Sequence, residues 1–151
     1  MTVTIMRGIP GSGKSTYLEE HWLDKLPPFR SHVLVSADHY FEGPEGYKFD
    51  PSKLGEAHET CMRNFVRSVY RGTTYIAVDN TNISVAEIAP YYSVARAFGY
   101  NVEIVNCFTP TDIASQRNVH GVPASACERM ANALAEQKLP PFWTYKNIIR
   151  G

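Results

Sequence analysis

One eight-residue stretch constrains this chain more than any other, because it has the spacing of a phosphate-binding loop. Its fixed positions follow G-x-x-x-x-G-K-S, an apolar segment of strand length precedes it, and a helical pattern follows it. Successive backbone N–H groups of such a loop converge on a phosphate, and glycines allow the close approach that this needs. The residues expected to bind a nucleoside triphosphate are Gly8, Ile9, Pro10, Gly11, Ser12, Gly13, Lys14, Ser15 and Thr16.

The last residues of this loop carry the chemistry of phosphoryl transfer. Lys14 supplies a positive charge to the terminal phosphates and is a predicted catalytic residue. Ser15 is expected to place its hydroxyl on Mg²⁺, while the helix that begins here points the positive end of its dipole at the triphosphate. ATP and Mg²⁺ are therefore the expected cofactors. The loop fits GTP as well and leaves the phosphate acceptor open.

Length, charge and cysteine content limit the remaining classes of protein. A chain of 151 residues can bury a core without cross-links, and we expect one domain over residues 1–138 with a tail over 139–151. Fifteen basic and fifteen acidic side chains cancel, so any grip on nucleic acid must be local. The three cysteines lie far apart, which argues against a disulfide framework or a zinc site.

The expected location follows from the same features. The apolar run at the start is only strand-length and lacks the basic flank of a signal peptide. No segment approaches the length that spans a bilayer. We therefore expect a cytoplasmic enzyme with no membrane partner, and the sequence leaves its oligomeric state open.

Strand patterns and helix patterns alternate along the chain. Short apolar runs bounded by polar residues predict strands, and longer runs with helical periodicity, glycine stops and capping residues predict helices. The fold class expected is α/β, a P-loop NTPase-type three-layer sandwich with a parallel sheet of four or five strands and a small helical lid. Strands are predicted at 3–7, 32–37, 74–79 and 101–108, and helices at 14–25, 51–71, 84–98, 110–117 and 123–138.

Two aspartates end neighbouring predicted strands, and both should face the triphosphate because ligands bind at the carboxyl ends of parallel strands. We assign Asp38 as the general base for an acceptor hydroxyl, a role worth about 10²–10⁴-fold. Asp79 is assigned to Mg²⁺ or its water shell. The alternative for either residue is a helix cap or a loop anchor. In an NTPase without an acceptor, Asp38 or a glutamine would instead position water.

Arg117 is the third candidate catalytic residue. It lies in a polar segment, residues 115–121, that follows the fourth strand and could close over the nucleotide as a lid. A guanidinium there would neutralise charge on the transferring phosphoryl group, an effect of about 10³–10⁵-fold where an arginine finger has been measured. A plain surface arginine is the alternative.

Four motifs together resemble the small P-loop kinases related to polynucleotide 5′-hydroxyl kinase. They are the loop 8–15, Ser36-Ala37-Asp38-His39-Tyr40, Val78-Asp79-Asn80-Thr81-Asn82 and Arg117-Asn118-Val119-His120-Gly121-Val122-Pro123. The likeness covers roughly residues 3–135. It implies that Asp38 is the catalytic base, Asp79 the essential strand-end aspartate and Arg117 a lid arginine. It also implies a substrate site that includes Asp38, Asn80 and Asn82.

The chain departs from this family on the acceptor side. Polynucleotide kinases carry an arginine three residues after the base, where this chain has Phe41, and His120 stands nearest the place of a second lid arginine. The pair Tyr40 and Phe41 could stack on a base of the substrate, worth roughly 1–3 kcal/mol per base. Packing of Phe41 against the sheet edge is an equal alternative.

These features predict a Mg²⁺-dependent kinase that transfers the ATP γ-phosphate to a hydroxyl of DNA or RNA, foremost a 5′ end. A related branch of the family resembles kinases of the hydroxymethyl group of 5-hydroxymethyluracil in phage DNA, which is the first alternative. A small-metabolite kinase and a nucleotide-binding switch without an acceptor are the others. The aromatic and basic tail is expected to pack on the domain and bury Trp143 and Ile148, with contact to nucleic acid as its alternative.

Overall fold

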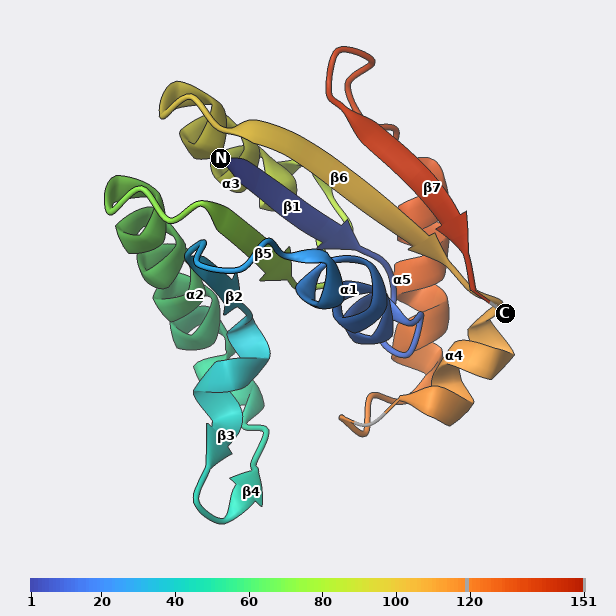
Figure 1. The fold of residues 1–151 in the computed structure, drawn as a ribbon. Helices are drawn as coiled ribbons and strands as arrows, with labels where there is room; N and C mark the ends of the chain where they lie inside the picture. Colours follow the sequence, from blue (N-terminus) through green and yellow to red (C-terminus); the bar gives the residue numbers. More distant parts are fainter. Residues whose placement is uncertain (119, 151) are drawn as a thin grey trace.

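A parallel five-stranded sheet forms the centre of the molecule in a computed structural model that describes residues 1–118 and 120–150 (Figure 1). Its strands stand in the order β2-β5-β1-β6-β7. Because the chain crosses over on both sides of β1, the loop after β1 lies where the strand order reverses, the place where open α/β sheets bind ligands. The strands are β1 (Thr2–Arg7), β2 (His32–Val35), β5 (Tyr75–Asp79), β6 (Asn101–Phe108) and β7 (Tyr145–Ile149).

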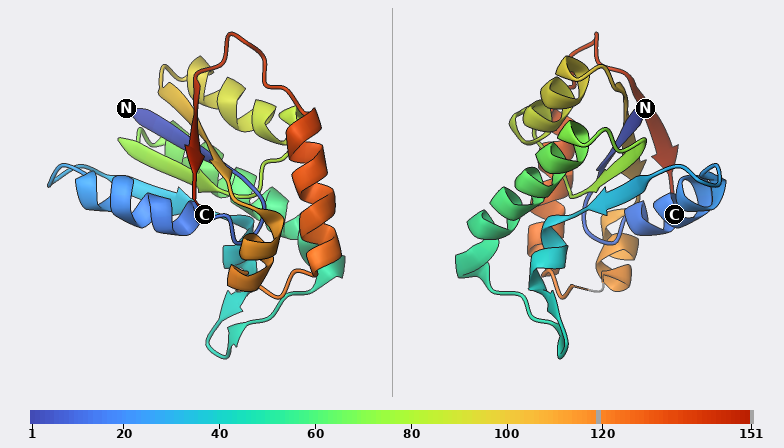
Figure 2. Two further views of the ribbon diagram at one scale, coloured as in Figure 1. Left: turned by 90° about the vertical axis from the view of Figure 1, so that its right-hand side faces the viewer. Right: turned by 60° about the vertical axis from the view of Figure 1, so that its left-hand side comes forward.

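Helices cover both faces of this sheet and give it three layers, which confirms the predicted fold class. Helix α1 (Lys14–His21) packs Leu18 and the following Trp22 against one face, together with the turn η1 (Leu23–Lys25). Helices α2 (Leu54–Tyr70) and α3 (Val85–Ala97) pack against the other. Figure 2 shows α1 and α3 on opposite sides of the strands.

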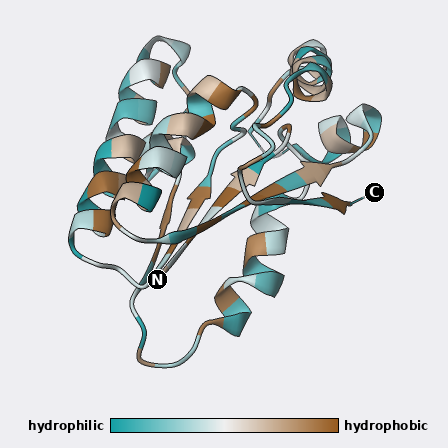
Figure 3. Cartoon of the chain, turned by 90° about the horizontal axis from the view of Figure 1, so that it is seen from above, coloured by the Kyte–Doolittle hydropathy of each residue, from teal (hydrophilic) through white to brown (hydrophobic). Residues whose placement is uncertain are grey.

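The burial of the strands explains their apolar sequences. Five of the six residues of β1 are buried, as are three of the five residues of β5. Strands covered on both faces carry near-continuous apolar runs, and Figure 3 shows hydrophobic residues on the central strands with polar colour on the outer helices. Helix α2 buries one stripe at helical spacing, formed by Ala57, Cys61, Phe65 and Val69.

Capping residues begin two helical segments close to the positions predicted from the sequence. Ser84 and Glu87 form the capping box of α3, in which the Ser84 hydroxyl accepts a hydrogen bond from the Glu87 N–H. Asp50 accepts a hydrogen bond from the Ser52 N–H and starts the turn η3 (Pro51–Lys53) ahead of α2. The first helix is shorter than predicted, because α1 ends at His21 before η1.

Two segments differ from the sequence prediction. No strand is predicted between the strand at 32–37 and the helix at 51–71, but this segment contains a hairpin of β3 (Glu42–Gly43) and β4 (Gly46–Tyr47). The tail contains β7, which pairs in parallel with β6. Trp143 stacks on Tyr92 with ring centroids 4.6 Å apart, and Trp143 and Ile148 are half-buried rather than fully buried.

Two short helical segments complete the lid side of the sheet. Helix α4 (Thr111–Arg117) follows β6, and α5 (Ala124–Glu136) packs Leu134 near Ile9 and Ala114. Among the described residues, no helix has both the length and the hydropathy to cross a membrane. The three cysteines are buried and unpaired with one another.

Candidate active site

The loop after β1 adopts the conformation that phosphate binding requires. Gly11 and Gly13 have φ values of 79° and 95°, in the left-handed region that glycine adopts without steric cost. A side chain at Gly11 would also collide with the backbone of Ala114 in α4. Helix α1 begins at Lys14, directly after Gly13, so its positive dipole end faces the loop.

Lys14 bends back over its own loop. Its Nζ donates hydrogen bonds of 3.0 Å to the carbonyl oxygens of Gly8 and Ile9. Burial lowers the pKa of Lys14, and the carboxylates of Asp79 and Asp38 act in the opposite direction. A cation that is desolvated and held by carbonyls is a strong partner for an incoming phosphate.

Ser15 and Asp79 meet at the carboxyl end of β5. The Ser15 hydroxyl donates a 2.9 Å hydrogen bond to the Asp79 carboxylate, although the residues are far apart in sequence. One hydroxyl and one carboxylate fit Mg²⁺, which is usually held by one or two carboxylates together with substrate phosphates and water. Among residues 1–118 and 120–150, no cluster of three metal-binding His, Cys, Asp or Glu side chains provides a closed metal site.

Asp38 lies in the turn η2 (Ala37–Phe41) directly after β2. The turn is fixed at its start, because the Ser36 hydroxyl accepts from the Asp38 N–H at 3.2 Å. The Ala37 N–H donates 2.8 Å to the side-chain oxygen of Asn80, which follows β5. Asn80 therefore joins the ends of two strands, and the candidate base is placed by the scaffold of the sheet.

Two further side chains contact the Asp38 carboxylate from segments distant in sequence. The Tyr47 hydroxyl of β4 donates 3.2 Å to Oδ1, and Nε2 of His120 lies 3.5 Å from Oδ2. The rings of Tyr47 and His120 pack on each other with centroids 4.4 Å apart. Burial, followed by the charge of Asp38, raises the pKa of Tyr47 to about 12. Tyr47 could not be predicted as a site residue from the sequence, because it lies between the predicted elements at 32–37 and 51–71 and reaches Asp38 only through the hairpin.

Asn80 and Asn82 belong to the scaffold rather than to an open surface. Asn80 is 8% exposed and Asn82 2%. The Asn82 amide donates 2.8 Å to the carbonyl of Met6, and its φ of 48° is left-handed. Both amides are thus engaged inside the protein, which does not support the prediction that they contact a substrate.

Arg7 organises this part of the scaffold and escaped the sequence analysis. It is 3% exposed at the end of β1. Its guanidinium donates to the carbonyls of Asn82, Ile83 and Gln137 and to the side chain of Asn106. Burial lowers the pKa of Arg7, with Glu87 acting in the opposite direction. A charged residue at the end of a strand that otherwise carries no charge is the sequence signal that could have found it.

The aromatic pair after the base divides into a buried and an exposed member. Phe41 is 6% exposed and packs edge-on against Tyr40, Tyr47 and Phe49. Its burial favours the packing alternative over base stacking. Tyr40 is 37% exposed, and its hydroxyl donates to Glu56 at 2.6 Å. An open cleft beside η2 is lined by Tyr40, Phe41, Lys48, Phe49, Asp50, Pro51 and Lys53.

Arg117 bonds to two residues that themselves contact the loop, because the Thr109 hydroxyl donates to the carbonyl of Ser12 at 3.0 Å and the Arg150 side chain lies against Gly13. The Nη2 of Arg117 donates 3.3 Å to the Thr109 hydroxyl and 3.2 Å to the carbonyl of Arg150. The Arg150 side chain also pairs with Glu20 at 2.9 Å. The structure thus brings Lys14, Ser15, Asp38 and Asp79 to one edge of the sheet and holds Arg117 between Thr109 and the residue that follows β7, Arg150.

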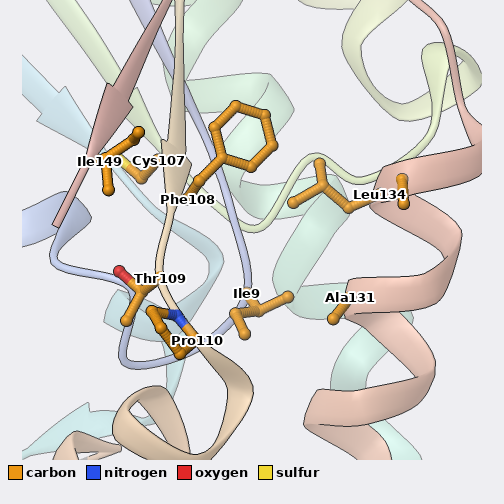
Figure 4. Close-up of a pocket in the computed structure, with 9 residues that line it drawn as sticks. Ile9, Cys107, Phe108, Thr109, Pro110, Ala131, Leu134 and Ile149 are labelled. Atoms are coloured by element: carbon orange, nitrogen blue, oxygen red, sulfur yellow. The ribbon is translucent and has the colours of Figure 1, made fainter. Parts of the chain in front are cut away.

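An apolar cavity of about 260 Å³ lies on the other side of the loop, between α5 and the ends of β6 and β7 (Figure 4). Ile9 forms one wall, and Leu134 and Phe108 form two others. Its lining contains no carboxylate, ammonium or guanidinium group. Phosphoryl transfer requires such groups, so this cavity is separate from the candidate site.

Comparison with known proteins gives a family model and a human relative. The model AAA_33, described as an AAA domain, matches residues 3–138. NEDD4-binding protein 2 from Homo sapiens is 33% identical over 135 residues, which cover 86% of this chain. The chain spans only 7% of the length of that relative.

Solved structures share the fold at low sequence identity. The Pnkp1/Rnl/Hen1 RNA repair complex contains a chain that superposes with a TM-score of 0.70 and 17% identity, over 89% of this chain and 44% of that one. The APS kinase CysC of Mycobacterium tuberculosis, solved with AMPPNP and APS, gives 0.60 and 16% identity over 98% and 87%. These likenesses show that the chain shares the fold of both structures.

Proposed function

We infer the function from one premise: this chain belongs to the AAA domain family AAA_33, and its fold is that of a P-loop kinase. We propose that it transfers the γ-phosphate of ATP to a hydroxyl of a polynucleotide, foremost a 5′ end. The observation that carries the transfer step is the convergence of Lys14, Ser15, Asp79 and Asp38 at one edge of the sheet.

On the donor side, the loop N–H groups and Lys14 bind the phosphates, and the charge of Lys14 offsets charge that develops on the transferring group. Ser15 and Asp79 are the residues that would hold Mg²⁺. When bound, the ion neutralises phosphate charge. On the acceptor side, Asp38 orients the acceptor hydroxyl and accepts its proton as the new P–O bond forms.

Arg117 is proposed to act only after the lid moves. Its present partners are an alcohol and a backbone carbonyl, which are weak partners for a guanidinium compared with a phosphate. A triphosphate on the loop offers charge-assisted bonds that could draw Arg117 from Arg150. This movement would complete the charge neutralisation around the transferring phosphoryl group.

The polynucleotide acceptor is supported by the cleft beside Asp38. The cleft combines the partly exposed rings of Tyr40 and Phe49 with two lysines, Lys48 and Lys53. Single-stranded nucleic acids are bound by this combination, in which aromatic rings stack on bases and cations follow the phosphates. The cleft replaces, in this proposal, the arginine that related kinases carry at the position of Phe41.

A small-molecule alcohol is the second candidate acceptor, and the charge of the same region favours it. Between residues 38 and 56 the chain has five carboxylates and only two lysines, a balance that repels a polyanion. The carboxylates are Asp38, Glu42, Glu45, Asp50 and Glu56, and the lysines are Lys48 and Lys53.

One labelling experiment separates these acceptors. The protein is incubated with γ-labelled ATP and, in parallel, a 5′-hydroxyl oligonucleotide, a duplex containing 5-hydroxymethyluracil, and a mixture of nucleosides and sugars. We expect label on the oligonucleotide. Label on the modified duplex or on a small molecule assigns the acceptor to that class. Hydrolysis without any labelled acceptor contradicts the kinase proposal and favours a nucleotide-binding switch.

A further inference from the structure

Tyr47 places a phenolic hydroxyl on the candidate base. Its phenol donates to Oδ1 of Asp38 at 3.2 Å, which is the kind of hydrogen bond that an acceptor hydroxyl must make in order to lose its proton to Asp38. His120 lies 3.5 Å from the second oxygen, Oδ2. Both oxygens of the carboxylate are therefore engaged by protein groups.

The fold holds the phenol in this position. Tyr47 pairs with Glu42 across the β3–β4 hairpin, and the Lys48 N–H donates 2.9 Å to the carbonyl of Phe41. The buried ring of Phe41 packs edge-on against one side of Tyr47 with a centroid distance of 6.1 Å. The ring of His120 packs nearby at 4.4 Å. The hairpin pairing and the two neighbouring rings therefore fix the position of the half-buried Tyr47 ring.

We propose that Tyr47 is a specificity-determining residue that makes the kinase select an alcohol acceptor over water, by occupying Asp38 until an acceptor displaces the phenol. The inference rests on the proposed function, because it takes Asp38 as the base. The phenol of Tyr47 stays protonated at neutral pH, since its pKa is raised to about 12.

The physical basis is the difference in binding energy between the two nucleophiles. An acceptor brings contacts from the rest of its surface, which can offset the cost of displacing the phenol. Water has no such contacts, so nothing offsets the cost of displacing the phenol when water is the nucleophile. In either reaction the nucleophile oxygen bonds to the γ-phosphorus, the bond to the β–γ bridging oxygen breaks, and the proton passes to Asp38. The products are ADP with either a phosphorylated acceptor or inorganic phosphate.

The test compares ATP hydrolysis with phosphate transfer in Tyr47→Phe, which removes only the hydroxyl and keeps the packed ring. A hydrogen bond to a charged group contributes about 1.5–3 kcal/mol, so we expect acceptor-free hydrolysis of ATP to rise about tenfold or more. With a saturating 5′-hydroxyl oligonucleotide, the ratio of phosphate released to phosphate transferred should also rise. Tyr70→Phe is the matched control, because Tyr70 is 80% exposed on α2.

Two further results decide the inference separately from the proposed function. In the double variant Asp38→Asn/Tyr47→Phe the gain in hydrolysis should disappear, because the released water has no base. Unchanged hydrolysis in Tyr47→Phe, or a gain that persists in the double variant, overturns the role of Tyr47 even if the wild-type protein phosphorylates the oligonucleotide. Absence of label on every acceptor with wild-type protein contradicts the proposed function, whereas the acceptor-free assay still measures the effect of Tyr47.

Discussion

The proposed nucleotide half and the proposed acceptor half of the site are built in different ways. The nucleotide half is one continuous loop, residues 8–16, with one added carboxylate, Asp79, at 2.9 Å from Ser15. The acceptor half gathers Asp38 from the end of β2, Tyr47 from a hairpin and His120 from the segment after α4. Its geometry depends on the whole fold, whereas that of the loop depends mainly on local sequence.

This difference indicates where the enzyme can vary. A contiguous loop with two left-handed glycines tolerates little change, because its backbone itself is the ligand-binding group. An acceptor site assembled from separate segments can change one segment at a time while the donor chemistry is kept. Structures with 16–17% identity to this chain share its fold and carry different names, an RNA repair complex and an APS kinase.

The largest expected effect tests a residue that belongs to neither half in the present conformation. Arg117 is held by Thr109 and Arg150, yet transfer requires charge neutralisation that the lid arginine would supply. We expect Arg117→Ala to lower the rate of transfer by at least about 10³-fold while ATP binding is largely kept. Single-turnover transfer of labelled phosphate measures this effect. An unchanged rate would leave Arg117 as a surface contact of the tail strand.

Asp38→Asn breaks the acceptor half alone. The amide keeps the shape of the side chain but cannot accept a proton, so we expect transfer to fall by about 10²–10⁴-fold with ATP affinity unchanged. Binding of a fluorescent ATP analogue and single-turnover transfer separate the two quantities. If transfer persists at the wild-type rate, Asp38 is not the base and the acceptor half lies elsewhere.

Lys14→Ala disrupts the nucleotide half. Unlike Asp38→Asn, it should weaken ATP binding as well as transfer. Removal of a preorganised cation is expected to lower transfer by about 10²–10³-fold and to weaken ATP binding as well, because the charge acts on bound phosphate before and during transfer. The pair of variants therefore distinguishes the halves, since only Lys14→Ala should change affinity. Equal ATP affinity in Lys14→Ala and wild-type protein would contradict the position of Lys14 on the phosphates.

The same division explains how far the sequence could predict the structure. The loop, α1 and the pairing of Ser15 with Asp79 follow from fixed spacing and from the shared edge of a parallel sheet. Helix starts at Asp50 and Ser84 follow from capping chemistry. These features depend on neighbours in sequence or on one general rule of topology.

The features that the sequence did not predict depend on distant contacts. The strands of the β3–β4 hairpin have two residues each, which is too short to show the alternation of polar and apolar residues that identifies a strand. Most residues of strand β7 are exposed, and the strand forms through its pairing with β6. Its sequence therefore lacks the buried apolar run that identifies a strand. Asn80 and Asn82 carry polar side chains at strand ends, where binding residues are common, but the fold uses their amides for backbone bonds.

The smallest expected effect is a dependence of stability on pH that isolates Tyr47. Its pKa is raised from the ordinary tyrosine value near 10 to about 12, so the folded protein retains a proton that the unfolded chain loses. The stability that this provides is complete below about pH 10 and is lost as the pH rises from about 10 to about 12. Urea unfolding at several pH values should therefore show that the difference in free energy of unfolding between the wild-type protein and Tyr47→Phe declines across that range.

Comparison with Tyr70→Phe corrects for the general loss of stability at alkaline pH that other tyrosines cause. A difference between wild-type and Tyr47→Phe that stays constant across that range would mean that burial and the charge of Asp38 do not raise the pKa of Tyr47 in solution.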